Sequence, residues 1–443
     1  MPQKKILAIH LNEFNLDFLR KGTSKFKCDN IRKILRYKHI ATYTPDKEQD
    51  KNLDPWVQSV SINTGIESKN HKIFNLGQKI PKKISQIWDI LTKKKISCAV
   101  WGAMNSTYID NKYLKVYFPD PWNHQTNTKP ESLKKIFTLP REYAQNYTNF
   151  KIFRNLKGIL SFFLACVNPQ LILFFIKNIF LYIKIFIKSG FSNYFLFFIF
   201  DIISLNIFRD LTKNKKINFS LIFLNSLAHF QHNNWDEKKN YYQYFLLTDE
   251  ICKIILDLSK NYDDVLIYNG FTQKKIKPEY IIRPKNAKQF MQLIGVKYKK
   301  LNSNMTNGGL ITFENNRQKI SSLEILKKFN IYGFKLFEIT ELDQINIFYR
   351  IQIKSYLNFN SSSISKGYKS KNIINKLSYD KKNLKLIKNS VGMNFNLFSQ
   401  NMIFIKTTGR HFFKGQLLTK NNFIKKNKIQ NSDIFSIIGK YFI

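Results

Sequence analysis

The sequence predicts an α/β protein built on a three-layer, doubly wound and mostly parallel β-sheet, with a helical insertion and a small α+β cap. Short apolar runs typical of buried strands alternate with stretches of helical periodicity. Polar side chains directly follow several of these runs. Two stretches of different character, 126–214 and 285–400, interrupt the alternation. We therefore expect one sheet-based core that is divided by two insertions.

The first core element is the run KKILAIHLNEFN at 4–15, which is apolar and then polar, as in a buried strand that enters a loop. The amphipathic stretch at 84–95 places Ile84, Ile87, Trp88 and Leu91 on one helical face. The other expected core elements are a helix at 16–21, strands at 39–44, 96–104 and 217–227, a helix at 241–260 and a strand at 263–270.

The interruptions divide the chain into five consecutive segments. Within 308–353 the order strand, helix, strand, strand predicts a small α+β subdomain, and 359–372 is a polar, basic loop. The run at 401–418 is typical of a strand that ends near His411. The expected segments are core (1–125), helical insertion (126–214), core (215–284), α+β cap (285–400), and core return with the C-terminal tail (401–443).

The charge is strongly basic. Lys and Arg number 72 against 30 Asp and Glu, which gives a formal net charge of +42. Two explanations stay open: a basic surface for an anionic partner, or the Lys-, Asn- and Ile-rich codon usage of an AT-rich genome. Because no nucleic-acid-binding motif accompanies the charge, nucleic acid is not the expected partner.

The four cysteines are far apart and form no CxxC pair, which indicates buried free thiols in a reducing compartment; they are Cys28, Cys98, Cys166 and Cys252. The basic start MPQKK precedes an apolar run of only about six residues, shorter than a signal-peptide core. We therefore expect a first core strand there and a cytoplasmic, non-secreted protein, with peripheral membrane association as an open alternative.

Residues 151–210 leave three interpretations open. No charge occurs from Gly158 to Ile176, after which Lys177, Lys184 and Lys188 recur on one helical face. The segment is a helical insertion packed on the sheet, a helix at an anionic membrane surface, or a membrane span. Asn, Pro and Gln at 168–170 in the middle of the apolar stretch disfavour the span.

Polar residues gather at the predicted strand ends, where α/β sheets bind ligands. Glu13 is a candidate general base or a helix N-terminal charge. Ser61 is a candidate nucleophile with His232 as its base, or a structural hydroxyl. The candidate catalytic residues are His232, His411, Glu13 and Ser61, and the candidate ligand-binding residues are Asn12, Gln58, Ser59, His229, Asn269 and Gln273.

Four segments in this order resemble the alkaline phosphatase superfamily, in its branch of type I phosphodiesterases and nucleotide pyrophosphatases. They are ILAIHLNEFN, SVSINTGIESKNHKIFNLG (59–77), FLNSLAHFQH and TTGRHFFKGQLL. With DPWVQSVSINTG and PDPW (119–122), the pattern is most similar to a bacterial subfamily of such proteins. The resemblance implies an alkaline phosphatase-like three-layer fold, and chemistry in which two zinc ions bind the phosphate and activate a Thr or Ser nucleophile.

Residue by residue, the resemblance implies a reduced metal site. The first metal-binding Asp of the family corresponds to Asn12, and the Asp of its Asp-x-x-x-His pair corresponds to Ala228, whereas the histidine of that pair is kept as His232. The late histidine is kept as His411. The next Asp-His pair falls on Asn269 and Gly270, and the nucleophile falls near Pro55 and Trp56, where no hydroxyl stands.

These losses predict that a dinuclear zinc centre is absent. One zinc ion on His229, His232 and His411 stays open, since three imidazoles can hold zinc; a metal-free polar pocket is the alternative. The expected function is that of a hydrolase or transferase on a phosphate- or sulfate-bearing small molecule, glycan or lipid-linked substrate. The alternative is a catalytically degenerate protein that binds such an anionic ligand.

Overall fold

The computed structural model describes residues 4–46, 53–123, 125–146, 158–160, 162, 164, 169–190, 192–213, 215–303, 307–331, 334–351 and 402–442. The chain forms two compact units. Unit 1 contains residues 1–140, 156–276 and 408–443, and unit 2 contains residues 141–155 and 277–407. The polar loop expected at 359–372 and Cys166 lie outside the described residues, and the other three cysteines are buried and unpaired.

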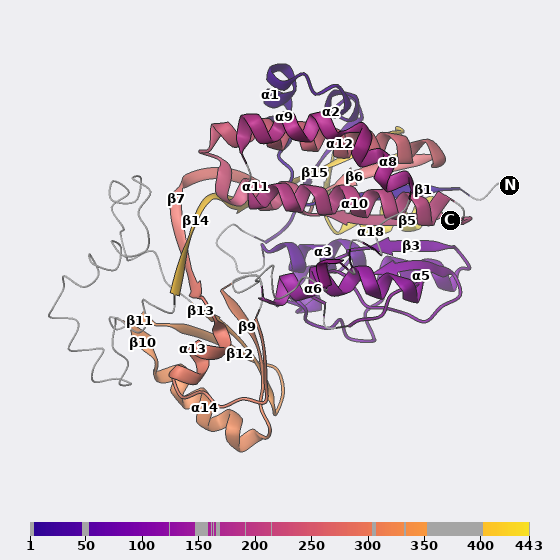
Figure 1. The fold of residues 1–443 in the computed structure, drawn as a ribbon. Helices are drawn as coiled ribbons and strands as arrows, with labels where there is room; N and C mark the ends of the chain where they lie inside the picture. Colours follow the sequence, from indigo (N-terminus) through magenta and orange to yellow (C-terminus); the bar gives the residue numbers. More distant parts are fainter. Residues whose placement is uncertain are drawn as a thin grey trace. The chain divides into compact units, whose positions relative to one another are not determined.

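Unit 1 is built on an eight-stranded sheet of order β16-β2-β15-β6-β1-β5-β3-β4 (Figure 1). Every neighbouring pair is parallel except those that involve β15, which runs antiparallel to β2 and β6. The predicted mostly parallel α/β sheet is confirmed. The strands are β1 (Ile6–Leu11), β2 (Lys38–Tyr43), β3 (Cys98–Trp101), β4 (Leu114–Phe118), β5 (Phe219–Leu224), β6 (Asp264–Tyr268), β15 (Lys414–Thr419) and β16 (Lys428–Gln430).

The alternation of side chains along β1 divides the core into two layers. Leu7, Ile9 and Leu11 point into the larger apolar cluster, whereas Ile6 and Ala8 point into the smaller one. Both sets are fully or almost fully buried, so the central strands are apolar on both faces, as parallel strands covered by helices are. The result is three layers: helices, sheet, helices.

The two apolar clusters assign the helices to the faces of the sheet. The larger cluster contains side chains of α1 (Leu16–Phe26), α2 (Asp29–Ile34), α10 (Asn193–Lys213), α11 (Ser226–Asn234) and α12 (Tyr241–Leu258). The smaller cluster contains side chains of α3 (Pro55–Thr64), α5 (Ile87–Lys93) and α18 (Asp433–Tyr441). The short α4 (Ser68–His71) packs beside α3.

From residue 131 on, the described part of the segment predicted as a helical insertion is mostly helical, with α6 (Lys134–Asn146), α8 (Pro169–Lys177), α9 (Ile179–Ser189) and α10. Buried side chains of α10 join the larger cluster. Within the described residues, no single helix has both the length and the apolar character of a membrane span. The α8–α9 pair, bent by 51°, meets the length and composition limits only as a pair.

Unit 2 carries a four-stranded antiparallel sheet of order β12-β13-β9-β8 with two helices packed against it. This is the α+β arrangement expected of the cap. Its elements are β8 (Lys300–Ser303), β9 (Gly308–Thr312), β10 (Asn330–Ile331), β11 (Phe334–Lys335), β12 (Phe337–Glu341), β13 (Asn346–Ile351), α13 (Ala287–Leu293) and α14 (Asn316–Lys328). β7 (Thr272–Pro284) and β14 (Met402–Phe412) pair with each other.

Candidate functional site

A buried carboxylate stands at the carboxyl end of β1. Glu13 follows the strand by two residues and has no exposed surface. Its backbone adopts the left-handed conformation, with φ of 54°, which favours glycine and costs free energy in other residues. Two side chains stabilise this turn at the Glu13 carbonyl oxygen: Gln231 Nε2 donates at 2.7 Å and Thr272 Oγ1 donates at 3.4 Å.

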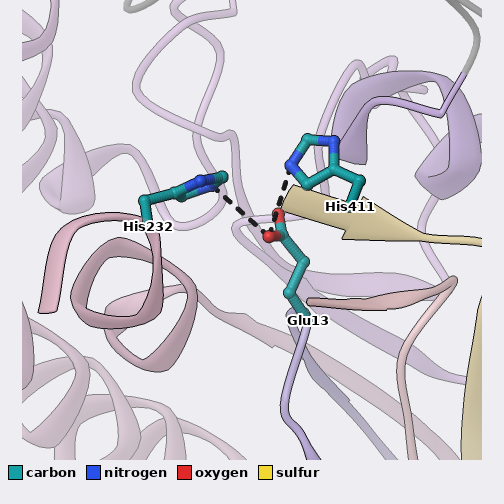
Figure 2. Close-up of side chains that lie close together, drawn as sticks. All are labelled: Glu13, His232 and His411. Atoms are coloured by element: carbon teal, nitrogen blue, oxygen red, sulfur yellow. Dashed lines mark ion pairs between the residues drawn. The ribbon is translucent and has the colours of Figure 1, made fainter. Parts of the chain in front are cut away.

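Two histidines converge on this carboxylate (Figure 2). His232 comes from α11, the helix after β5, and His411 comes from β14, next to β15. The Nε2 atoms of both rings lie 3.4 Å from the same oxygen, Oε2 of Glu13. The ring centroids are 5.2 Å apart. The His232 side chain is 34% exposed and that of His411 is 20% exposed, so the cluster is accessible from the histidine side.

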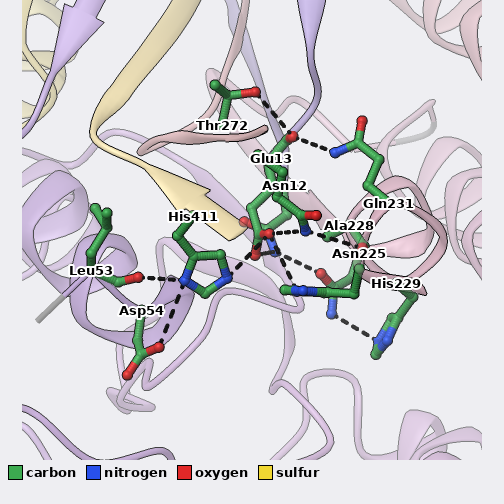
Figure 3. A network of polar contacts seen from close by, with 12 residues as sticks. Asn12, Glu13, Leu53, Asp54, Asn225, Ala228, His229, Gln231, Thr272 and His411 are labelled. Carbon is green, nitrogen blue, oxygen red and sulfur yellow. Dashed lines mark hydrogen bonds and ion pairs between the residues drawn. The ribbon is translucent and has the colours of Figure 1, made fainter. Parts of the chain in front are cut away.

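Amide groups hold the Glu13 carboxylate in place (Figure 3). Asn12 Nδ2 donates to Glu13 Oε1 at 3.0 Å and also to Asn225 Oδ1 at 2.7 Å. Gln273 Nε2 donates to Glu13 Oε2 and to the carbonyl oxygen of Ala228. Glu13 is therefore a fixed anion whose orientation is set from β1, α11 and β7.

The electrostatics of the cluster are strongly coupled. Burial by itself would raise the pKa of Glu13, but the two histidines and the hydrogen bonds from His411 and Gln273 lower it to about 2. Burial by itself would lower the pKa of His411, but Glu13, and more weakly Asp54, raise it to about 9. For His232 burial outweighs the attraction of Glu13, and its pKa is lowered to about 4. Without a bound cation, the stable state is a Glu13–His411 ion pair beside a neutral His232.

The orientation of the His411 ring is fixed by its other nitrogen. Nδ1 lies 2.6 Å from the carbonyl oxygen of Leu53, to which it donates, and 3.8 Å from Oδ1 of Asp54. A histidine that donates from Nδ1 to a carbonyl offers the lone pair of Nε2 to a metal ion. Nε2 is the ring atom that faces Oε2 of Glu13.

The donor geometry fits one small divalent ion. Zinc binds His nitrogen and carboxylate oxygen at about 2.0–2.1 Å in a tetrahedron, which places two ligand atoms about 3.3–3.4 Å apart. Two of the three donor separations among Glu13, His232 and His411 are 3.4 Å, and all three donor atoms lie within 4.8 Å of one another. Among the described residues this is the one group of three such side chains with that spacing.

His229 does not join this cluster. His229 and His232 both lie on α11, but the His229 ring stacks on Phe197 with centroids 4.0 Å apart. Its Nε2 lies 3.2 Å from Asn225 Nδ2. Of the three histidines considered from the sequence, the structure therefore brings His232 and His411 together, with Glu13 as their common neighbour.

Asn269 directly follows β6 at the same edge of the sheet, but its side chain bonds to backbone groups. Its Nδ2 donates to the Phe14 carbonyl at 2.8 Å, and its Oδ1 accepts from the Gln416 amide at 2.7 Å. Gln58 bonds with Asp46 and Asn431, and the Ser59 hydroxyl donates to the Met104 carbonyl at 3.4 Å. The structure gives these three candidate ligand-binding residues internal partners.

Ser61 is paired with His71 rather than with His232. Its Oγ lies 3.1 Å from His71 Nε2, and it donates to the Val57 carbonyl at 3.4 Å. His71 Nδ1 accepts the Ile73 amide, so Nε2 carries the proton and donates to the Ser61 oxygen. A ring nitrogen that already carries a proton cannot take one from the hydroxyl, so this pair does not form an activated nucleophile.

Close packing explains why a glycine, Gly409, stands two residues before His411 in the segment TTGRHFFKGQLL. A Cβ atom at this position would lie 2.3 Å from Gln273 Oε1, 2.6 Å from the Gln231 carbonyl and 2.7 Å from Trp235 Nε1. Real Cβ atoms do not approach other atoms so closely. Glycine therefore lets β14 lie against α11 and places His411, two residues later, next to Glu13.

Several residues of the network carry no signal in the sequence. Leu53, whose carbonyl orients His411, is an ordinary apolar residue. Asn225 and Gln231 lie in the segment FLNSLAHFQH, and Asp54 begins DPWVQSVSINTG, but nothing in these segments marks the three residues as partners of the cluster. The one available signal was Gly409, whose two-residue spacing to His411 indicated a close backbone approach.

The fold and the cluster define an α/β protein with two histidines and a glutamate at the carboxyl edge of a mostly parallel sheet. No family model and no curated protein matches the chain, so the bacterial subfamily stays a prediction. Among solved structures, the chain is similar to murine ectonucleotide pyrophosphatase/phosphodiesterase 5, with 9% identity, a TM-score of 0.41 and coverage of 99% of this chain and 95% of the other. The human protein gives 10%, 0.40 and the same coverage. At this level of similarity, function has to be argued from the chain's own residues.

Proposed function

We propose that the protein is a single-metal hydrolase or transferase that acts on a phosphate- or sulfate-bearing substrate, with Glu13, His232 and His411 as the metal ligands. The observation that carries the proposal is the pair of 3.4 Å distances from one buried carboxylate oxygen to two imidazole nitrogens. Two histidines and one glutamate are the ligand set of a catalytic zinc site that keeps one position open.

The surrounding residues support a metal site over a simple ion pair. The carboxylate is held by Asn12 and Gln273, and the His411 ring is held by the Leu53 carbonyl. Such partners orient the metal ligands and fix the histidine tautomer. When bound, a zinc-like ion would polarise a phosphoryl or sulfuryl oxygen and lower the pKa of a bound water.

The same residues favour one ion over two. Asn12 and Asn269 carry no charge, and Ala228 has no ligand atom, so no carboxylate compensates a second dication at these positions. Two dications at about 4 Å repel by several kcal/mol even at an effective dielectric constant near 20. The Asn12 amide nitrogen faces Glu13 and Asn225, and Asn269 is occupied by backbone groups.

Water or a hydroxyl of a second substrate is the nucleophile in this proposal. Ser61 is held by His71, and the position that the family resemblance assigns to the nucleophile holds Pro55 and Trp56. The His232 side chain is partly exposed and lines the accessible side of the cluster. The buried part of its surroundings lowers its pKa, so the ring stays neutral near pH 7. It therefore offers a metal ligand at neutral pH without prior deprotonation.

The substrate class rests on charge. The 72 basic residues outnumber the 30 acidic residues, and the resulting positive charge attracts anions to the protein surface. A phosphate or sulfate ester supplies both an anion for this field and an oxygen for the ion. A glycan or lipid-linked ester fits the same description. An assay with nitrophenyl esters distinguishes turnover from binding alone.

The test begins with the metal content of protein purified without chelators, measured by plasma mass spectrometry. We expect about one zinc per chain, and a large loss of zinc affinity in Glu13→Gln and His232→Ala, which each remove one of three ligands. The matched controls are His229→Gln, which changes a nearby histidine on the same helix, and His71→Gln. Both should keep the metal.

Turnover is then measured on bis-p-nitrophenyl phosphate, p-nitrophenyl phosphate and p-nitrophenyl sulfate with and without zinc. Zinc-dependent turnover that is absent in His232→Ala supports the proposal. Metal binding at Glu13 without turnover of any ester assigns the chain to the binding alternative. Protein that takes up no metal at micromolar zinc, or that binds it equally well in Glu13→Gln, overturns the metal site.

A further inference from the structure

The outer face of the bent pair α8–α9 is apolar and open. Of the 17 large hydrophobic side chains that are exposed in the described residues, eight lie on these two short helices. Phe180 and Ile187 are 81% and 79% exposed. The eight are Ile172, Leu173, Ile176, Ile179, Phe180, Ile183, Phe186 and Ile187. A contiguous face of this kind usually marks an interaction surface.

The opposite side of the same helices is part of the protein core. Leu171 of α8 and Tyr182 and Ile185 of α9 are buried members of the larger apolar cluster of unit 1. In Figure 1, α9 lies beside α12, with which it is in contact. The helices are thus apolar on the inner side, which packs in the core, and also on the exposed outer side.

Only positive charge accompanies this face. The sequence holds no Asp or Glu between Tyr143 and Phe200. Lys177, Lys184 and Lys188 are exposed on the two helices. Lys184 and Lys188 each follow an outward-facing isoleucine and so stand on one flank of the apolar strip, with Lys188 Nζ 4.7 Å from the Tyr242 ring centroid.

We propose that α8–α9 docks the protein on an anionic membrane surface, with the apolar side chains between the acyl chains and the lysines at the headgroups. An apolar face flanked by lysines is the pattern of helices that lie in the membrane interface. Each lysine near an anionic surface strengthens binding by about fivefold. The buried inner side keeps one face of the pair in the protein core, so the pair lies on the membrane and does not cross it.

A second copy of the chain fits this face less well. Two copies meeting through it would bring the lysines of both onto the rim of one contact, and each copy carries a formal net charge of +42. Like charges at a contact oppose association, whereas anionic lipid neutralises them. This inference is independent of the metal site and of the proposed reaction.

The test is flotation of the full-length protein with vesicles of phosphatidylcholine alone or with 30% phosphatidylglycerol. We expect binding to the anionic vesicles, at least tenfold weaker binding to the neutral ones, and loss of most binding between 0.1 and 0.5 M salt. Phe180→Ser with Ile187→Ser should abolish binding. Lys184→Gln with Lys188→Gln should weaken it about 25-fold, as two lysines at about fivefold each predict.

Matched controls separate the site from general hydrophobicity and charge. Ile320→Ser with Leu293→Ser changes exposed apolar residues of unit 2, and Lys82→Gln with Lys83→Gln changes exposed lysines far along the chain. Both pairs should bind as the wild type does, and all variants should melt alike. Equal binding to both vesicles, no binding, or concentration-dependent dimers that disappear in the Phe180 and Ile187 variant would overturn the proposal.

Discussion

Nε2 of His411 lies 3.4 Å from Oε2 of Glu13, although the two residues belong to opposite ends of the chain. Antiparallel pairing of β15 with β6 brings the end of β14 to the edge where β1 ends. The contact makes Glu13 acidic and His411 basic, with pKa values of about 2 and about 9. The site therefore depends on one late strand that returns to the sheet.

Gln273→Leu should lower zinc affinity by about 10–100-fold, the usual effect of losing a partner that orients a metal ligand. Gln273 Nε2 donates to Glu13 Oε2, and leucine removes that bond at similar volume. Competition with a fluorescent chelator measures the affinity. Gln86→Leu, at a buried glutamine that caps α5, should reduce thermal stability and leave the affinity unchanged. Equal affinity in the wild type and Gln273→Leu would contradict the prediction.

Gly409→Ala should destabilise the protein by about 1–3 kcal/mol, the usual cost of overpacking, and should displace His411. The added carbon would lie within 2.7 Å of three atoms, including Gln273 Oε1 and the Gln231 carbonyl. Urea unfolding and zinc affinity are the measurements. Gly439→Ala is the control, since its Cβ would meet nothing within 4 Å in α18 and should stabilise the helix. If Gly409→Ala is as stable as Gly439→Ala, the close approach of Gly409 to Gln273 and Gln231 is refuted.

Ser61→Ala should retain any ester hydrolysis within about threefold, because the hydroxyl oxygen accepts a hydrogen bond from His71 Nε2 and is not an activated nucleophile. The lost hydrogen bond should lower the free energy of unfolding by about 1 kcal/mol. Initial rates on a nitrophenyl ester, corrected for folded fraction, test this. A loss of rate greater than 100-fold would show that Ser61 takes part in the reaction.

Asp120→Asn should remove a contribution to the free energy of unfolding that falls as pH rises. Burial raises the pKa of Asp120 to about 7, even though the carboxylate accepts the Trp122 and Asn105 amides. The folded state then binds a proton more tightly than the unfolded state, so stability falls as pH rises from about 4 to 7. Urea unfolding between these pH values measures the slope. Burial also raises the pKa of Asp201 and lowers that of His232, and these two groups contribute slopes of opposite sign, so the variant is compared with the wild type. The same change of stability between pH 4 and pH 7 in both proteins would contradict the prediction.

The sequence by itself determined that the core is a mostly parallel α/β sheet, although β4 and β16 lie outside the strands expected from it. The runs that became β1, β5 and β6 are apolar except for one residue each, because parallel strands covered on both faces are buried on both, and this pattern is local. The alternation with helices and the α+β character of the cap follow from the same local periodicity. Polar residues after β1 and β5 also indicated the edge at which Asn12, Glu13 and His232 stand.

Only the tertiary structure decided which side chains meet there. His229 and His232 look equivalent in the sequence, but one ring stacks on Phe197 and the other points at Glu13, because three residues rotate a helix by most of a turn without completing it. Glu13, and not His229, meets His232 and His411 through a left-handed turn that no periodicity encodes. Strand composition is a property of neighbours along the chain, whereas a site is assembled from side chains that are distant in sequence and close in space.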